Sequence, residues 1–530
     1  MRKYMNIINR LLFGAVALAA LSCTGNFEAY NRNPDQPSTI DRDVWDYIKS
    51  MQYNVIPTVK NQYQIVENVS GGAYGRYFAY AKSTDAGWNT GMFAFYRIAN
   101  DWANPPYEVP MTNIYSNWRA IKAELEEPED DYRMALAQII RVAAMQRVTD
   151  IQGPIPYRTM ENNDDLTAPY QSQEAVYGFM LEDLDHAVNV LETYITLAGT
   201  DVVAEAASAD YVYSGNLAKW IRFANSLKLR MAMHISYAAP DEAERIVKEA
   251  LSGENGGVIE SNADNAQIPT QNNPFRVVMY DYNGGDSRVS ADITSYMNGY
   301  KDPRRAKYFT LSTFTGGIRN GYIGLRSGIS IPSESLLYSN MVVDYTTPLM
   351  WMNAAEVAFL KAEASLRGWY GATGDAERWY EEGVRLSFEQ WGLSGDYDAY
   401  IGDGVSLPES YEDPLGKESN TSEVSTVTVK WDTRGDFETN LEQIITQKWL
   451  AIYPEGFEAW CEFRRTGYPR LMPATNNRSG GIIPEGGYAN RMPYPVEEYQ
   501  ENNEHINEAV SLLGGPDNMA TRLWWDCKEK

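Results

Sequence analysis

The chain has 530 residues, of which 46 are basic and 71 are acidic, and its formal net charge is −25. This charge excludes a partner bound through phosphates, because nucleic-acid binding requires a basic face. Three His and three Cys leave little material for zinc or iron–sulfur sites. A hydrophobic content of 44% with 22% charged residues indicates a globular chain with a large core. Its aromatic residues are mostly Tyr (37) and Trp (14), the two types that carry a polar group.

Residues 1–22 have the pattern of a secretory signal peptide, with a positive start followed by a short apolar run over 11–21. The run ends in ALSC, a bacterial lipobox pattern, which predicts that Cys23 is the lipidated first residue of the mature protein. The alternative is an ordinary signal peptide with an incidental cysteine. No later stretch has 18 uninterrupted apolar residues, so the sequence favours a lipid anchor over a membrane-spanning helix.

After the lipid anchor, residues 23–42 are polar and proline-containing and are predicted to form a tether. Residues 43–530 are predicted to form one large α-rich domain. Its two cysteines, Cys461 and Cys527, could form a disulfide in an oxidising compartment. The helical context of Cys461 favours two free thiols instead, because a small buried thiol packs as an apolar group.

Helical periodicity runs through most of this domain. The stretches 130–150 and 216–236 carry apolar stripes at helical spacing, and helix pairs joined by short turns are predicted over 353–392 and 440–467. Helix pairs in series indicate tetratricopeptide-like packing, in which each pair buries its face on the next.

Three regions are predicted to be irregular, namely 69–118, 253–350 and an insertion over 393–436 that contains a short strand in SEVSTVTVKW (422–431). Loops of this length in a compact domain are usually functional. The catalytic and nucleotide-binding motifs GxSxG, HExxH, Walker A, GxGxxG and CxxC are absent from the sequence. His234 lies near the end of a helical stretch and is predicted to be packed or to cap the helix.

Aromatic residues are concentrated in 74–118, where Gly, Asn, Asp and Ser are interleaved with them, as in STDAGWNTG (83–91). A sugar ring has an apolar CH face and a polar rim, which suit an exposed aromatic ring with polar side chains nearby. Core packing is the better explanation for any single ring, but the context of Trp88 is that of an exposed loop.

Eight blocks resemble, in chain order, conserved blocks of the SusD/RagB family of outer-membrane nutrient-binding lipoproteins from Bacteroidetes. They are NFEAYNRNPDQPS (26–38), DIQGPIPY (150–157), KWIRFANSLKLRMAMHIS (219–236), YKDPRRAKYF (300–309), PLMWMNAAEVAFLKAEA (348–364), ITQKWLAIYPEGFEAWCEFRRTGYPRL (445–471), NRMPYPVEEYQENN (490–503) and GGPDNMATRLWWD (514–526). Each block is moderately specific, and eight of them behind a lipobox are strongly so.

The resemblance implies a mainly α fold, in which about four tetratricopeptide-like helix pairs form a right-handed superhelical scaffold. An irregular second part with a few short strands completes it. It also implies a surface-exposed lipoprotein, held on the outer membrane by its lipid, that captures oligosaccharides and passes them to a SusC-like TonB-dependent transporter. The resemblance implies a binder and not an enzyme, with no cofactor. The acidic loops are chemically compatible with a structural Ca²⁺, but no EF-hand-like spacing supports a particular site.

Two other functions stay open from the sequence, a peptide-binding lipoprotein of the same family and, less favoured, a surface glycoside hydrolase. The family's ligand residues lie in variable loops, so the site here is predicted from composition and loop context. The predicted ligand-binding residues are Tyr80, Asp85, Trp88, Asn89, Tyr96, Trp102, Tyr280, Tyr282, Asn283, Asp286, Arg288 and Tyr322.

Overall fold

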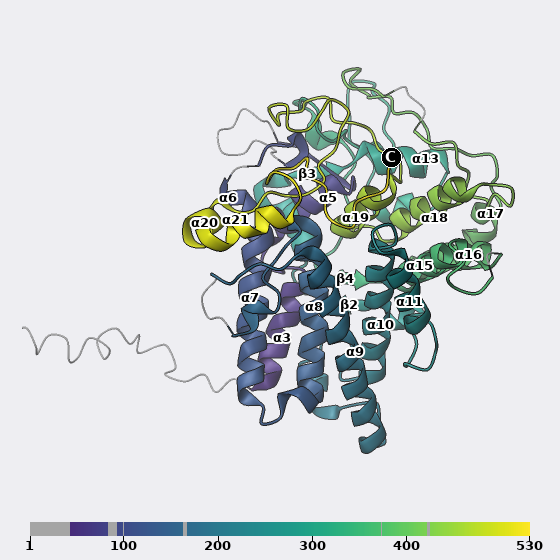
Figure 1. Ribbon diagram of the computed structural model, residues 1–530. Helices are drawn as coiled ribbons and strands as arrows, with labels where there is room; N and C mark the ends of the chain where they lie inside the picture. The colour runs from purple at the N-terminus through teal and green to yellow at the C-terminus, as the bar shows by residue number, and fades with distance from the viewer. Residues whose placement is uncertain are drawn as a thin grey trace, which may run out of the picture. The chain divides into compact units, whose positions relative to one another are not determined.

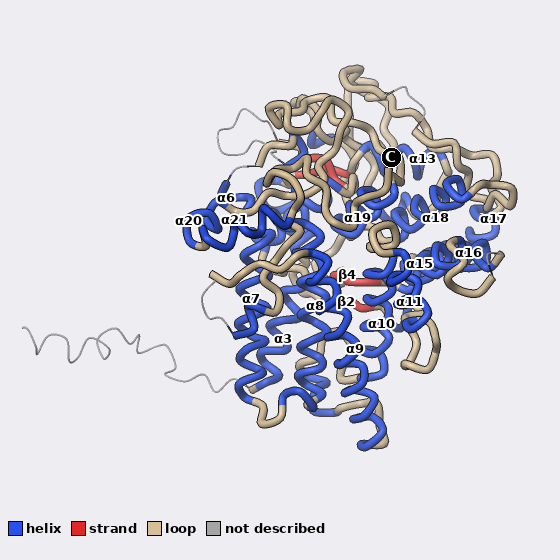
Figure 2. The backbone as a smooth tube through the Cα atoms, in the orientation of Figure 1, coloured by secondary structure: helices blue, strands red, loops and turns tan. Residues whose placement is uncertain are grey.

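The computed structural model describes residues 43–82, 93–98, 100–162, 167–372, 374–420 and 424–529. The predicted signal peptide, tether and Cys23 lie outside the described residues. Contacts group Val44–Lys530 into one compact unit. This unit is mainly helical, and its strands are few and short (Figure 2), as the sequence predicted.

Four helix pairs form the scaffold of this unit (Figure 1). The pairs are α3 (Val44–Val55) with α7 (Pro105–Glu124), α8 (Tyr132–Gln152) with α9 (Gln173–Ala198), α10 (Leu217–His234) with α11 (Pro240–Ala250), and α15 (Ala354–Leu366) with α16 (Asp375–Gln390). Successive pairs also pack on each other through α7 and α8, α9 and α10, and α10 and α15. This is the tetratricopeptide-like arrangement that the periodicity predicted.

Side-chain caps fix where several of these helices begin. Ser172, Asn216 and Asn353 precede α9, α10 and α15, and each side chain accepts a hydrogen bond from a backbone N–H in the first turn. A further hairpin, α18 (Phe437–Ala451) with α19 (Gly456–Thr466), confirms the second predicted helix pair.

Shorter elements complete the unit. The helices are α4 (Lys60–Tyr63), the π-helix η1 (Gln64–Gly71), α5 (Gly72–Tyr74), α6 (Asn100–Ala103), α12 (Pro274–Arg276), the π-helix η7 (Val277–Asp281), α13 (Ala291–Gly299), α14 (Arg305–Tyr308), α17 (Tyr397–Ile401), α20 (Val496–Glu501) and α21 (Asn503–Leu512). The 3₁₀ turns are η2 (Phe93–Phe95), η3 (Pro128–Asp130), η4 (Thr159–Asn162), η5 (Ala204–Ser208), η6 (Asn262–Asp264), η8 (Tyr282–Gly284), η9 (Ser335–Leu337) and η10 (Ser394–Asp396).

The strands form two antiparallel pairs. In one, β1 (Phe78–Tyr80) pairs with β3 (Ser287–Val289), so that Phe78 lies opposite Val289. In the other, β2 (Ala266–Ile268) pairs with β4 (Leu349–Met352). Both pairs join segments that are far apart in the sequence. Their hydrogen bonds hold the long loops of the second part in place.

One predicted irregular region, 69–118, is wrong in its last part, because α7 begins at Pro105. Pro105 and Pro106 occupy the first turn of this helix, where backbone N–H groups have no partner within the helix. Pro110 follows inside the same helix. Three prolines in six residues obscured a helix whose first turns tolerate them.

The strand predicted within 422–431 is also wrong for its described part, which runs from Val424 and forms no strand. The carbonyl groups of this segment are satisfied by side chains instead of a neighbouring strand. The Gln443 amide donates to the carbonyl oxygens of Thr428 and Lys430 at 3.0 and 2.8 Å, and the Tyr380 hydroxyl donates to that of Val429 at 2.5 Å. Alternating valines therefore reflect one buried face of an extended loop.

Most aromatic rings pack in the core. Tyr77 stacks on Trp449 with ring centroids 5.6 Å apart, and Tyr308 stacks on Tyr453 at 4.7 Å. Cys461 is buried and Cys527 is exposed, and both are free thiols, as the helical context of Cys461 predicted.

Candidate functional site

The pairing of β1 with β3 brings together the two loop regions in which the sequence predicted a ligand site. Beyond the strands, the Ala81 N–H donates to the carbonyl oxygen of Asp286 at 2.8 Å. On the other side of β3, the Leu325 N–H donates to the carbonyl oxygen of Val289 at 2.8 Å, which adds the segment that carries Tyr322. Residues from three distant parts of the sequence therefore share one loop-rich face.

Three of the predicted ligand residues support this face from inside, because Tyr80, Asp286 and Arg288 are buried. Gln64 of the π-helix η1 donates to the Asp286 carboxylate. The Arg288 guanidinium donates to the carbonyl oxygen of Leu336 at 3.1 Å. The Asp286 and Arg288 side chains thus hold the loops together, and all three side chains are shielded from solvent.

Other predicted residues of the first loop are packed or lie outside the described residues. Tyr96 is buried, and Arg76 donates to its hydroxyl at 3.3 Å. Trp102 is half-buried and stacks on Phe93 with centroids 6.3 Å apart. Outside the described residues lie Asp85, Trp88 and Asn89, and the side chain of Asn283 is not described either.

A group of tyrosines and cations surrounds the short helices before β3. The Arg276 guanidinium lies 4.3 Å from the ring centroid of Tyr280 and 4.9 Å from that of Tyr345. Tyr280 is half-buried and donates its hydroxyl to the carbonyl oxygen of Met341. Tyr282 is half-buried, with Lys60 Nζ 5.1 Å from its ring centroid. Tyr345 is 42% exposed, and the sequence analysis missed it because a single Tyr in a long loop carries no distinguishing signal.

Tyr322 lines a polar pocket of about 280 Å³, here named the Tyr322 pocket. The lining residues are Thr294, Ser295, Asn298, Arg319, Tyr322, Ile323, Glu409, Ser410, Tyr411 and Glu412. The Asn298 amide donates to the Tyr322 carbonyl oxygen at 2.8 Å, and the Tyr411 hydroxyl donates to that of Gly324 at 2.8 Å. These bonds fix the aromatic wall, while Arg319 and the two glutamates are exposed at its edge.

Ser295 gives the strongest indication that this pocket receives a polar ligand. Its side chain belongs to α13 and is only 2% exposed, yet its hydroxyl has no hydrogen-bond partner among the described residues. An unpaired buried hydroxyl costs free energy, so such groups call for a partner. A ligand hydroxyl or a water molecule in the pocket would supply it. The sequence offered no signal for Ser295, because an internal helix serine is ordinary.

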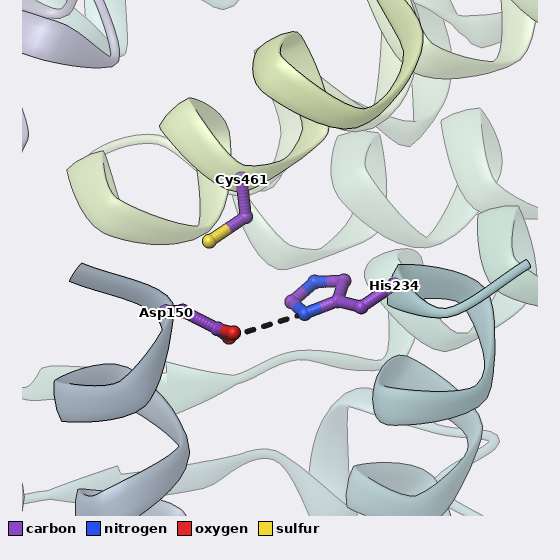
Figure 3. Close-up of side chains that lie close together, drawn as sticks. All are labelled: Asp150, His234 and Cys461. Atoms are coloured by element: carbon purple, nitrogen blue, oxygen red, sulfur yellow. Dashed lines mark hydrogen bonds and ion pairs between the residues drawn. The ribbon is translucent and has the colours of Figure 1, made fainter. Parts of the chain in front are cut away.

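A buried group of potential metal ligands lies between the helices (Figure 3). Atoms of Asp150, His234 and Cys461 come within 4.8 Å of one another. His234 is packed, as predicted, and its ring nitrogens lie 3.2 Å from Asp150 and 3.3 Å from Glu458. Burial alone would lower the pKa of His234, but the Glu458 and Asp150 carboxylates outweigh it and raise that pKa to about 9. With the imidazole protonated, both ring nitrogens donate and the two carboxylates accept, so the group forms a buried ion-pair cluster.

Helix pairs in series that carry a loop-rich region with a polar pocket define a protein with a tetratricopeptide-like scaffold. The family model described as Susd and RagB outer membrane lipoprotein matches residues 26–526, and the chain belongs to this SusD-like family of outer-membrane lipoproteins. Among the described residues, no helix is long and apolar enough to cross a bilayer.

Solved structures of SusD homologues share this fold over nearly the whole chain. One from Bacteroides uniformis is 42% identical, with a TM-score of 0.83 over 92% of this chain and 99% of its own. One from Bacteroides thetaiotaomicron is 39% identical, with a TM-score of 0.84 over 92% of this chain and 100% of its own. A SusD homologue from Flavobacterium johnsoniae described as chitin-binding is 35% identical, with a TM-score of 0.84 over 92% of this chain and 99% of its own. Among curated proteins, none matches this chain.

Proposed function

We propose that this protein is a surface-exposed, non-enzymatic lipoprotein that binds an oligosaccharide and delivers it to a SusC-like TonB-dependent transporter of the outer membrane. Membership of a family of outer-membrane lipoproteins supports the location. A relative described as chitin-binding supports a glycan ligand. The observation that carries the binding part is the Tyr322 pocket with its unpaired Ser295 hydroxyl.

The lining of the pocket suits a sugar. The Tyr322 ring lines the pocket with the Arg305 guanidinium 5.6 Å from its centroid, and Ser295, Glu409 and Glu412 add polar groups, so ring and polar groups together suit a pyranose. The two glutamates face one exposed arginine, Arg319, and the chain has a net charge of −25. This balance disfavours anionic polysaccharides and favours neutral ones.

The test is calorimetric titration of the signal-deleted protein with neutral oligosaccharides, including chito-oligosaccharides. Replacing Tyr322 with Ala is expected to weaken binding at least tenfold, which is about 1.4 kcal/mol. The control is Tyr370→Ala, because Tyr370 is also half-buried but packs against Trp379 at the turn between α15 and α16, with ring centroids 6.0 Å apart. Unchanged affinity in Tyr322→Ala would exclude this pocket.

Trp88 stays the strongest sequence prediction for a stacking platform. Trp88→Ala is expected to weaken glycan binding at least tenfold in the same titration. Equal affinity of the variant and the wild type would remove Trp88 from the site.

Delivery requires a second protein. A stable complex would bury about 2,000 Å² or more, so pull-down from detergent-solubilised outer membranes is expected to recover a barrel transporter. Recovery of the lipoprotein alone under mild conditions would contradict delivery. A silent glycan array with retention of a peptide mixture would favour a peptide ligand, and turnover of a polysaccharide would favour a hydrolase.

A further inference from the structure

A second cavity, of about 410 Å³, lies at β4 and the end of α16 and shares no lining residue with the Tyr322 pocket. It is named here the Tyr453 pocket. Its walls are largely apolar and include Phe275, Met341, Val343, Leu349 and Met350. Volume and lining are those of a small-molecule site, in which apolar walls surround a few placed polar groups.

The polar groups of the Tyr453 pocket are buried and incompletely paired. Tyr453 is 4% exposed, and its hydroxyl has no hydrogen-bond partner within the described part of the chain. Glu455 is 7% exposed, and its carboxyl group lies 3.9 Å from the guanidinium of Arg147, beyond hydrogen-bond distance. Burial raises the pKa of Glu455 to about 8, so this carboxyl group is mostly protonated at neutral pH and can donate a hydrogen bond.

The remaining lining adds an aromatic face. Trp391 follows α16 and is half-buried at the pocket, and Lys307 and Asp344 are exposed at the rim. Two opposite charges at the rim give the entrance no net charge. A neutral ligand is therefore favoured, with a face that can lie on an indole ring and groups that can bond to a hydroxyl and a neutral carboxyl.

We propose that the Tyr453 pocket binds a neutral pyranose ring that carries a methyl group, as in a 6-deoxy sugar or an N-acetylated sugar. The proposal rests on the proposed function, because it takes the ligand to be a sugar. The thioether and aliphatic walls accept a methyl group, whereas a hydroxyl in its place would lose its water without gaining a partner. Tyr453 and Glu455 then bond to the ring hydroxyls.

The test uses fluorine NMR of protein labelled with 5-fluorotryptophan, in which the Trp391 signal is assigned by its absence in Trp391→Phe. Two matched pairs of probes separate the two sources of the methyl group. L-Fucose is compared with L-galactose, and N-acetylglucosamine with N-formylglucosamine. At least one methyl-bearing sugar is expected to shift the Trp391 signal saturably and to bind at least tenfold more tightly than its partner, because apolar pockets discriminate a methyl group by about 10–200-fold.

Variants test the assigned groups. Tyr453→Phe is expected to weaken binding at least threefold, because it removes one hydrogen bond and keeps the ring. Val343→Thr is expected to reduce the preference for the methyl group, because it adds a hydroxyl to the wall at nearly constant volume. If circular dichroism shows that Val343→Thr does not fold, the comparison of Tyr453→Phe with the wild type still tests whether the pocket binds the sugar.

Absence of a saturable Trp391 shift with both methyl-bearing sugars would overturn the proposal, as expected for a cavity that holds only water. Equal affinity within both matched pairs, or unchanged affinity in Tyr453→Phe, would overturn it too. Loss of the Trp391 response in Tyr322→Ala would show a single site and also overturn it. If calorimetry shows oligosaccharide binding but Trp391 does not respond, the proposed function stands and the Tyr453 pocket proposal fails. If neither calorimetric binding nor a Trp391 response is found, both the proposed function and the Tyr453 pocket proposal fail.

Discussion

Replacing Ser295 is expected to affect ligand binding in the Tyr322 pocket and protein stability differently. Ser295→Ala removes a buried hydroxyl that has no partner, so the free energy of unfolding of the unliganded protein is expected to stay equal or rise by up to about 1 kcal/mol. Oligosaccharide affinity is expected to fall about three- to tenfold, because one hydrogen bond to the ligand is lost. Denaturant unfolding and calorimetric titration measure the two effects.

The matched control is Ser290→Ala at the start of the same helix, where the Ser290 hydroxyl accepts a hydrogen bond from the Asp292 N–H at 3.3 Å. Loss of this N-cap is expected to destabilise the protein by about 1 kcal/mol. If Ser295→Ala destabilises the unliganded protein as much as the control does, its hydroxyl has a structural role and the argument for a ligand fails.

Sequence composition predicted which loops carry the site, and the structure shows where the side chains of the described residues lie. Tyr80, Asp286 and Arg288 were predicted to face a ligand, and the structure buries them around the β1–β3 pair. That outcome depends on the pairing of two segments more than 200 residues apart along the chain, which no local pattern encodes. Ser295 was missed because its importance lies in an absent partner, which only a three-dimensional structure reveals.

At the scale of elements, the Gln443 side chain makes hydrogen bonds to the extended segment 424–431 of the kind that a neighbouring strand would make. Its amide group bonds to the carbonyl oxygens of Thr428 and Lys430, and its side-chain oxygen accepts from the Asp432 N–H at 3.1 Å. Gln443→Leu is expected to destabilise the protein by about 1–2 kcal/mol, because the segment loses three hydrogen bonds to one side chain. Amide hydrogen exchange is expected to accelerate over 424–436.

Gln390→Leu is the control for this change, because Gln390 is half-buried at the end of α16, away from the extended segment. It is expected to leave exchange over 424–436 as in the wild type. Equal exchange in Gln443→Leu and the wild type would show that the segment is held by its buried valines alone.

The turn before β3 depends on a glycine. Gly285 has φ of +88°, and a Cβ there would lie 2.3 Å from the carbonyl oxygen of Met279. Gly285→Ala is therefore expected to destabilise the protein by more than the roughly 1–2 kcal/mol that a left-handed conformation costs a non-glycine residue. Gly284→Ala is the matched control, because Gly284 has φ of +71° but only Lys82 Nζ within 4 Å, at 3.9 Å. Similar melting temperatures for the two variants would contradict the close approach at Gly285.

Helices were predictable from the sequence where apolar periodicity and capping residues agreed, as in α10, which begins after the Asn216 cap. They were missed where proline dominates the composition, as in the first turns of α7. At 424–431 the error is the opposite one, because a strand was predicted where none forms. Alternating β-branched residues indicate that one face is buried, but a strand also needs a neighbouring strand to pair with.

At the scale of the whole molecule, buried charges connect the helix pairs to the α18–α19 hairpin. Arg230 of α10 donates to the Glu356 carboxylate of α15 through two bonds of 2.7 Å. Lys448 of α18 lies 3.6 Å from Glu356, and Arg230 lies 3.4 Å from Glu458 of α19. The charges are paired across elements that are far apart in the sequence, so composition could not reveal them. Removing one partner of such a buried pair typically costs about 3–5 kcal/mol.

This network makes the stability of the protein depend on pH. The pKa of His234 is raised to about 9 from an ordinary value of 6.5, and that of Glu455 to about 8 from 4.5. Both groups hold a proton more strongly in the folded than in the unfolded state, so their contribution to stability is complete at low pH and is lost as pH rises. For Glu455 the loss runs from about pH 4.5 to 8, and for His234 from about 6.5 to 9.

The free energy of unfolding is therefore expected to fall by several kcal/mol between pH 4.5 and pH 9, with both groups contributing above pH 6.5. Urea unfolding at a series of pH values measures it. His234→Gln is expected to flatten the curve above pH 6.5, because it removes one of the two protons. His186→Gln, on the surface of α9, is the control and is expected to keep the wild-type slope. A His234→Gln curve with the wild-type slope would contradict a protonated His234 in the folded protein.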